Sequence, residues 1–174
     1  MDAVAVTYDA LPANQEKISN WVKDEQIDAV LIDYNLRKGN FSTENGIVIA
    51  ARLFRQMKPT VLTTVHKMAD IEEGIWLGRY VPALLNKSRM SEIESALSRA
   101  VDELQGKIRP ERKAYRTIVR VENIDQRHAN LVILAHDPHA TIVVSTPELK
   151  KRLNTDITPG TRFKAEVNIG AATI

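Results

Sequence analysis

The chain has 174 residues, which is enough for one medium-sized domain or two small ones. Its hydrophobic fraction of 44% and charged fraction of 26% are typical of water-soluble proteins, and no apolar run reaches the length of a membrane span. The absence of cysteine excludes disulfides, thiolate nucleophiles and cysteine-based zinc sites. The first residues, MDAVAVTYDA, lack the basic-then-apolar pattern of a signal peptide, so we expect a cytoplasmic protein without membrane partners.

The charge is distributed unevenly along the chain. Residues 1–106 contain 12 Lys and Arg against 15 Asp and Glu, whereas residues 107–174 contain 12 against 7. An asymmetry of this kind indicates two units with different partners. We therefore predict a first domain over residues 1–106, a basic linker over residues 107–116 and a second domain over residues 117–174.

In the first domain, short apolar runs alternate with helical patterns. The last helix has a Ser91-x-x-Glu94 capping box at its start and Gly106 at its end. Alternating strands and helices predict an α/β fold, with a parallel sheet covered by helices on both faces. The predicted strands are residues 4–8, 29–33, 60–65 and 82–85, and the predicted helices are residues 12–25, 45–57, 69–77 and 91–105.

The second domain has a different pattern, with runs of β-branched residues that repeat at the short period typical of strands. Its predicted strands lie within residues 116–124, 130–137, 141–147 and 157–169, with one short helix at residues 148–153. A Pro159-Gly160 turn precedes the last strand. Several short strands and one brief helix favour a small β-barrel of OB-like type, and an SH3-like barrel stays open.

Polar residues follow the ends of three predicted parallel strands. Asp33 ends one strand, Thr63 and Thr64 end the next, and Asn86 and Lys87 follow the third. Because ligand sites of parallel α/β sheets lie beyond the carboxyl ends of the strands, these side chains should meet at one edge. Such a carboxylate can accept a phosphoryl group, a hydroxyl can bind its oxygens, and a lysine can neutralise its charge.

With these residues, the stretch from about residue 3 to 105 resembles the receiver domain of bacterial two-component response regulators. Asp33 in LIDYNL matches the phospho-accepting aspartate, Gly46 in ENGIVIAARL matches the glycine after the loop, Thr64 in PTVLTTV matches the switch residue, and Lys87 in ALLNKS matches the family's lysine. The resemblance implies a flavodoxin-like sheet with Asp33 as phospho-acceptor, Thr64 as switch and Lys87 as charge partner. It also implies protein partners, a histidine kinase or another signalling protein, bound through the last strand and last helix.

The chain departs from the family at three places. No segment matches the family's first strand, which ends in two adjacent acids that help to hold Mg²⁺, and neither Asp2 nor Asp9 has that paired spacing. Ser88 stands where a proline usually follows the lysine, and the loop at residues 37–46 is longer and more polar than usual. We therefore expect no cofactor, with Mg²⁺ needed only if Asp33 is phosphorylated.

Two explanations for the unmatched strand stay open. The domain is either a degenerate receiver, or its first strand lies upstream of this sequence. A sheet that lacks a strand also has an exposed edge, which favours a homodimer or pairing with a partner strand.

Other conspicuous residues have simpler structural interpretations. Trp21 and Trp76 lie on apolar helical faces and are predicted to be core residues. His128 and the segment His136-Asp137-Pro138-His139 lack the spacing of a metal site, so a solvated turn and no metal are expected.

No nucleophilic triad, glycine-rich phosphate loop or catalytic carboxylate pair is present, so we do not expect an enzyme. The sequence predicts a non-catalytic signalling adaptor built on the receiver-like domain. The alternative is a nucleic-acid-binding protein in which the first domain mediates oligomerisation and basic side chains contact phosphates, with a steep salt dependence. The candidate phosphate contacts are Arg109, Arg112, Lys113, Arg116, Lys150, Lys151 and Arg152.

Overall fold

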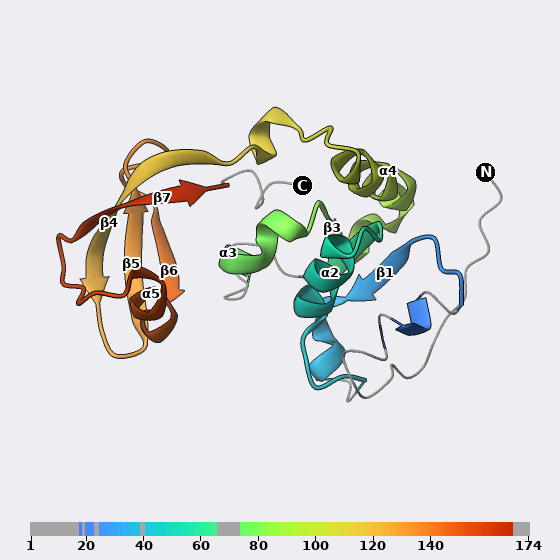
Figure 1. Cartoon of the computed structure of the whole chain (residues 1–174), viewed down its shortest axis with the longest axis horizontal. Helices are drawn as coiled ribbons and strands as arrows, with labels where there is room; N and C mark the ends of the chain where they lie inside the picture. Colours follow the sequence, from blue (N-terminus) through green and yellow to red (C-terminus); the bar gives the residue numbers. More distant parts are fainter. Residues whose placement is uncertain (1–17, 19, 23–24, 39–40, 66–73, 169–174) are drawn as a thin grey trace. The chain divides into compact units, whose positions relative to one another are not determined.

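The computed structural model describes residues 18, 20–22, 25–38, 41–65 and 74–168 (Figure 1). These residues divide into two compact units. The first contains the described residues up to 65 and residues 80–107, and the second contains residues 74–79 and 108–168. Within the described part of the chain, no helix has the length and apolar character needed to cross a membrane.

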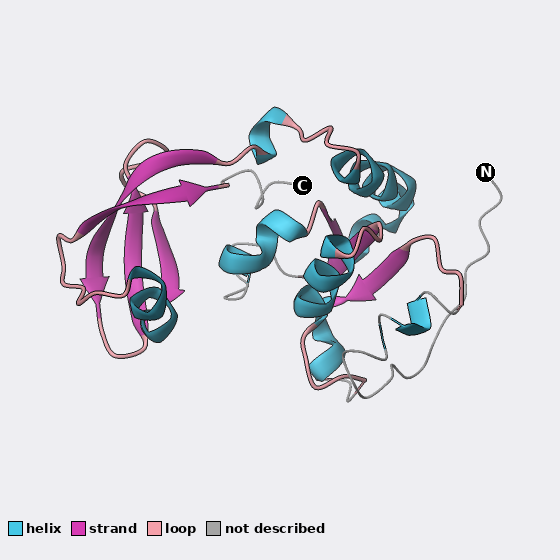
Figure 2. Cartoon of the chain, in the orientation of Figure 1, coloured by secondary structure: helices cyan, strands magenta, loops and turns pink. Residues whose placement is uncertain are grey.

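The first unit is built on a parallel sheet with the strand order β1-β2-β3 (Figure 2). The strands are β1 (Val30–Asp33), β2 (Thr60–Thr64) and β3 (Ala83–Asn86). All five residues of the central strand β2 are buried, as expected for a parallel strand covered on both faces. The parallel α/β arrangement predicted from the sequence is therefore confirmed, whereas the strand predicted at residues 4–8 lies outside the described residues.

At the edge of this sheet, β1 is less buried than its apolar run suggests. Ile32 is buried, but the side chain of its neighbour Leu31 is 43% exposed. Leu31 lies in register with Val61 of β2, so only one of its flanks has a neighbouring strand among the described residues. At Leu31 the sheet is therefore less completely covered than the predicted helices on both faces imply.

Two helices cover the sheet. Helix α2 (Gly46–Arg55) contacts β1 and β2, and helix α4 (Ile93–Leu104) contacts β2 and β3. On the face that meets α4, Val61, Ala83 and Leu85 pack with Ala96. Leu62 follows Val61 in β2, so its side chain points to the opposite face of the sheet. Leu62 is also fully buried, so both faces of the sheet are covered at β2.

Between the strands and these helices lie short 3-10 helical segments, η1 (Tyr34–Arg37) and η4 (Lys87–Glu92), and η4 is kinked at Arg89. Of the predicted helix at residues 12–25, the described residues 18 and 20–22 are helical and residue 25 lies in a turn.

The start of α4 corrects the predicted capping box. The α-helix begins at Ile93 rather than beside Ser91, and its N-cap residue Glu92 makes no capping hydrogen bond with its side chain. The preceding turn η4 is capped instead by Asn86, whose side chain accepts a hydrogen bond from the Ser88 N–H. The local Asn-x-Ser pairing therefore determines where helical structure starts.

The predicted end of α4 is confirmed. Gly106 has φ +82°, and its N–H donates to the carbonyl of Glu103 at 3.0 Å. The N–H of Lys107 donates to the carbonyl of Asp102 at 2.9 Å. These two bonds form a Schellman motif, which needs the left-handed conformation that glycine adopts most readily.

The second unit contains an antiparallel sheet with the order β6-β5-β4-β7. Its elements are α3 (Gly74–Leu77), η5 (Pro110–Arg112), β4 (Tyr115–Ile124), β5 (His128–Ile133), β6 (Thr141–Ser145), α5 (Thr146–Leu153) and β7 (Arg162–Val167). The strands and the helix lie close to their predicted positions, and Gly160 has the positive φ expected of the Pro-Gly turn. Pairing among the described residues does not close this sheet, so the OB-like barrel stays a prediction.

The short helix α3 belongs to the second unit, a feature not foreseen in the predicted domain boundaries. Trp76 packs against that unit's apolar core, which includes Val119, Leu131 and Leu149. The guanidinium carbon of Arg152 lies 4.2 Å from the centroid of the Trp76 ring, within the range of a cation–π interaction. Trp76 is therefore a core residue as predicted, but it packs against the core of the second unit.

The turn between β4 and β5 gives a testable pH dependence. The backbone N–H groups of His128 and Arg127 donate to Asp125 Oδ1 at 2.7 and 2.6 Å, and they lower the pKa of this carboxyl below its usual value. A lowered folded-state pKa contributes stability above the unfolded-state pKa, and this contribution is lost as the pH falls through the folded-state pKa. We expect an NMR titration of the Asp125 carboxyl to show a midpoint below that of a model peptide, and an unshifted midpoint would contradict this account.

Candidate functional site

The polar residues at the ends of the parallel strands meet at one edge of the first unit's sheet. Asp33 of β1 lies in register with Thr63 of β2, and Thr64 lies in register with Asn86 of β3. Because the three strands run in parallel, their carboxyl ends lie together, with Lys87 immediately beyond β3. The predicted convergence of Asp33, Thr64 and Lys87 at this edge agrees with the register.

Asp33 and Lys87 form an ion pair across the edge. Lys87 Nζ lies 2.5 Å from Asp33 Oδ2, although the two residues are 54 positions apart in sequence. The other carboxylate oxygen, Oδ1, accepts the Asn35 N–H at 3.2 Å and caps η1. The Asp33 side chain is 36% exposed and that of Lys87 is 43% exposed, so the carboxylate is paired and partly hydrated. Both oxygens therefore have a donor, which is how the chain tolerates a carboxylate after an apolar strand.

The two threonines of β2 are buried. Thr63 donates its hydroxyl hydrogen to the carbonyl of Ile32 at 3.2 Å, which ties β2 to β1. Thr64 is fully buried at the last position of the strand. Its hydroxyl is thus placed beneath the edge, so a switch role for Thr64 would require a movement of the β2 end.

Gly46 fixes the position of Asp33 by close backbone contact. A Cβ atom added to Gly46 would lie 1.9 Å from the carbonyl oxygen of Asp33 and 2.7 Å from its carbonyl carbon. No side chain fits at that separation, since backbone atoms cannot rotate out of the way. The first residue of α2 must therefore be glycine for the helix to approach the end of β1 this closely.

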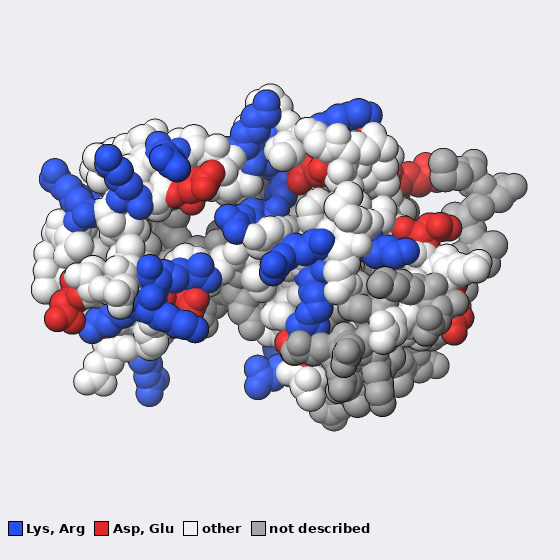
Figure 3. Space-filling view, in the orientation of Figure 1, with Lys and Arg blue, Asp and Glu red and all other residues white. Residues whose placement is uncertain are grey.

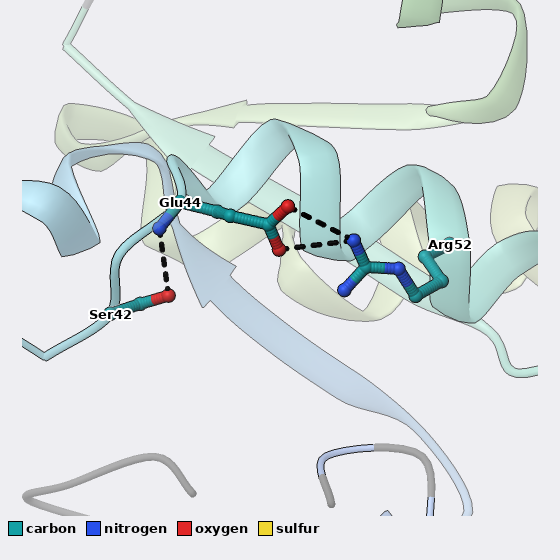
Figure 4. A network of polar contacts seen from close by, with 3 residues as sticks. All are labelled: Ser42, Glu44 and Arg52. Atoms are coloured by element: carbon teal, nitrogen blue, oxygen red, sulfur yellow. Dashed lines mark hydrogen bonds and ion pairs between the residues drawn. The ribbon is translucent and has the colours of Figure 1, made fainter. Parts of the chain in front are cut away.

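A polar network holds the loop that leads into Gly46 (Figure 4). Arg52 Nη2 lies 3.1 and 3.0 Å from the two carboxylate oxygens of Glu44, which joins the loop to the second turn of α2. The Ser42 hydroxyl oxygen accepts the Glu44 N–H at 3.1 Å. The polar character of this loop, which departs from the receiver pattern, therefore has a structural role.

Ser88, the second departure from the receiver pattern, also has a local explanation. Its N–H donates to Asn86 Oδ1 at 3.0 Å, and its hydroxyl donates to the same oxygen at 2.8 Å. A proline at this position has no N–H to donate. The Asn86 side chain therefore caps η4, and the neighbouring Lys87 forms the ion pair with Asp33.

The described residues contain no cluster of three or more His, Asp or Glu side chains suited to a metal ion. The candidate acids Asp2 and Asp9 lie outside the described residues. In the turn at His136–His139, Asp137 Oδ1 accepts the His139 N–H at 2.8 Å, which is a local turn bond.

The predicted basic cluster is not one surface. Arg112 is 2% exposed, so its side chain does not lie on the surface. Arg152 pairs with Glu148 at 2.9 Å and stacks on Trp76. Helix α5 packs through Leu149 against the core face of the sheet, and it carries Lys150, Lys151 and Arg152. Arg116 lies on the other face of the sheet, because it is an odd number of positions from the core residue Val119 in β4. The linker residues Arg109 and Lys113 are half-buried and exposed, respectively.

Removal of the Lys87 charge should have a small but measurable effect on stability. Partly exposed ion pairs contribute about 0.2–1 kcal/mol, so we expect Lys87→Met to lower the free energy of unfolding by roughly 0.5–1 kcal/mol. Lys107→Met is a matched control, because Lys107 pairs with Asp102 at 3.3 Å with more exposed side chains. Urea denaturation at low and high salt measures both variants, and an equal effect of the two would contradict a special role for the Lys87 pair.

The site thus combines a paired carboxylate, a buried hydroxyl and a lysine at one sheet edge. No protein-family model matches the chain, and no curated protein or solved structure shows significant similarity to it. The functional assignment therefore rests on the residues of the site.

Proposed function

We propose that this chain is a non-catalytic regulatory adaptor, in which a receiver-like first unit acts through protein–protein contacts. The observation that carries the proposal is the ion pair of Asp33 and Lys87 at the carboxyl edge of the parallel sheet. This pair links the turn after β1 to the turn after β3, so it holds these two segments of the sheet edge together. The same two residues, together with Gly46 and Thr64, carry the resemblance to receiver domains.

We place the contact surface on the exposed side of η4 and α4. Val101 of α4 is 38% exposed although it is apolar, and Met90 of η4 is 40% exposed. The buried face of α4 is instead formed by Ala96 and Ala100. Exposed apolar side chains on the two elements that follow Lys87 favour a protein partner that covers them.

The second unit fits an OB-like domain as the other half of the adaptor. Three antiparallel strands, a helix and a further strand follow one another in the chain, and β4 pairs with both β5 and β7. Its core lies on one face of the sheet and includes Leu149 of α5. We propose that the basic segment over residues 107–116 connects this domain to the receiver-like unit, with its last two residues, Tyr115 and Arg116, already in β4.

Affinity capture with matched variants tests the adaptor function. The full chain, Val101→Asp and Lys107→Met would each be used as bait in a lysate of the source cells, with quantitative mass spectrometry of the proteins retained. We expect a protein retained by the full chain and Lys107→Met but lost with Val101→Asp, whose folding is checked by thermal denaturation. Identical sets of proteins for all three baits would contradict the proposed contact surface.

A further inference from the structure

The antiparallel sheet of the second unit has its apolar core on one face, and on the opposite face basic residues gather along β4 and β7. On β4, Val119 and Val121 are buried in the core, so Arg116, Ile118 and Arg120 point to the opposite side. On β7, Phe163 and Ala165 pack against the core, so the exposed residues Arg162 and Lys164 also lie on that opposite side. Lys and Arg side chains project from the surface of this unit (Figure 3).

The strand register brings these cations together. Arg120 lies directly opposite Arg162, Ile118 opposite Lys164, and Arg116 opposite Glu166. Directly opposite residues of an antiparallel pair share a face of the sheet. We call the four residues Arg116, Arg120, Arg162 and Lys164 the outer basic face, which extends about 14 Å along β4 for four residues of rise.

The charges on this face are incompletely compensated. Arg120 pairs with Glu122 at 2.7 Å, but neither Arg162 nor Lys164 forms an ion pair with any other described residue. Like charges directly opposite each other destabilise a sheet, and Arg120 and Arg162 are such a pair. Arg162 and Lys164 therefore offer two unneutralised cations, beside Arg116 and Arg120, to an anionic ligand that lies across both strands.

We propose that the outer basic face binds the sugar–phosphate backbone of single-stranded nucleic acid. Three of its four cations are arginines, whose planar guanidinium groups bind phosphate in a bidentate manner. The face is a sheet surface rather than a helix or ribbon that enters the groove of a duplex. Ile118, which is 47% exposed, offers apolar contact between the cations.

The chemistry of this face also predicts the kind of binding. Neither β4 nor β7 has an aromatic ring on this side, so stacking on bases contributes nothing and the binding tolerates any sequence. For three or four neutralised phosphates, log K should fall with log salt concentration with a slope of about −2 to −3. The inference is independent of the proposed adaptor function, since its residues belong to the second unit.

Lys150 and Lys151 provide a matched control within the same unit. They are exposed on α5, which packs through Leu149 against the core face, and so they lie away from the outer basic face. Arg162→Glu/Lys164→Glu and Lys150→Glu/Lys151→Glu change the net charge equally. The two double variants therefore separate a defined surface from a general effect of charge.

Fluorescence anisotropy with a labelled single-stranded oligonucleotide of mixed sequence tests the proposal on the full chain. We expect Arg162→Glu/Lys164→Glu to weaken binding by about tenfold or more and to reduce the salt slope by about 1 to 2, with little change for the α5 variant. Arg162→Gln/Lys164→Gln is the second variant if the charge reversal disturbs folding, and it should raise the unfolding temperature by relieving the repulsion from Arg120.

Three results would overturn the proposal. The first is no binding by the full chain at low salt, and the second is an equal loss of affinity in the two double variants. The third is tighter binding of poly-glutamate than of the oligonucleotide, which would assign the face to an acidic protein segment.

Discussion

Replacement of Gly46 by alanine should lower the free energy of unfolding of the first unit by about 3 kcal/mol or more. Helix propensity alone predicts the opposite sign, since alanine is favoured over glycine by about 1 kcal/mol inside a helix. The steric term dominates because the new Cβ would lie 1.9 Å from the Asp33 carbonyl oxygen, and both groups belong to the backbone. Relief of this clash requires α2 to move away from β1.

Gly106→Ala is the control for a general effect of glycine replacement. Gly106 has φ +82° and no atom within 4 Å of an added Cβ, so its replacement should cost about 1 kcal/mol of backbone strain. Urea denaturation of both variants provides the comparison. A Gly46→Ala variant as stable as the parent protein would show that α2 and β1 do not approach as closely as described.

Trp76→Ala should destabilise the second unit by about 2–3 kcal/mol, although residue 76 lies far in sequence from the strands of that unit. The ring is partly buried against the core around Val119 and Leu149, so its loss should cost less than the 3–5 kcal/mol of a fully buried tryptophan. Loss of the cation–π contact with Arg152 should add about 0.5–1 kcal/mol. Trp76→Phe keeps an aromatic ring and should lose less.

Hydrogen exchange followed by mass spectrometry is the measurement for these variants, because it reports on the strands separately. Peptides from β4 and β5 should exchange faster in Trp76→Ala than in the parent protein. Peptides from β2, in the other unit, provide the internal comparison. Unchanged protection of β4 and β5 would show that α3 is not part of the second unit's core.

The elements that could be predicted from the sequence are those defined by local pattern. β2 was predicted because TVLTT is a continuous apolar and β-branched run, and all of it is buried. The Schellman end of α4 was predicted from Gly106. The meeting of Asp33 and Lys87 followed from the rule that parallel strands end at one edge, together with the resemblance to receiver domains.

The features that could not be predicted depend on contacts between distant residues. Nothing in the helical pattern around Trp76 indicates that its ring packs beside Arg152, since this contact joins residues 76 positions apart. Arg112 reads as part of a basic linker, but its side chain is buried. The candidate phosphate contacts predicted from the sequence combined residues of the linker with residues of α5. The strand register instead places Arg116 on the same face as Arg120, Arg162 and Lys164.

We propose that Asp33 and Lys87 form a lasting ion pair in a regulatory, non-catalytic site. The intact mass of the full chain after incubation with Mg²⁺ and acetyl phosphate tests this proposal, with Asp33→Asn as the control. We expect no gain in mass, because Lys87 occupies one carboxylate oxygen and no adjacent acids in the sequence match the pair that holds Mg²⁺ in receiver domains. A gain of one phosphoryl group that is lost in Asp33→Asn would contradict this claim and make Asp33 a working phospho-acceptor.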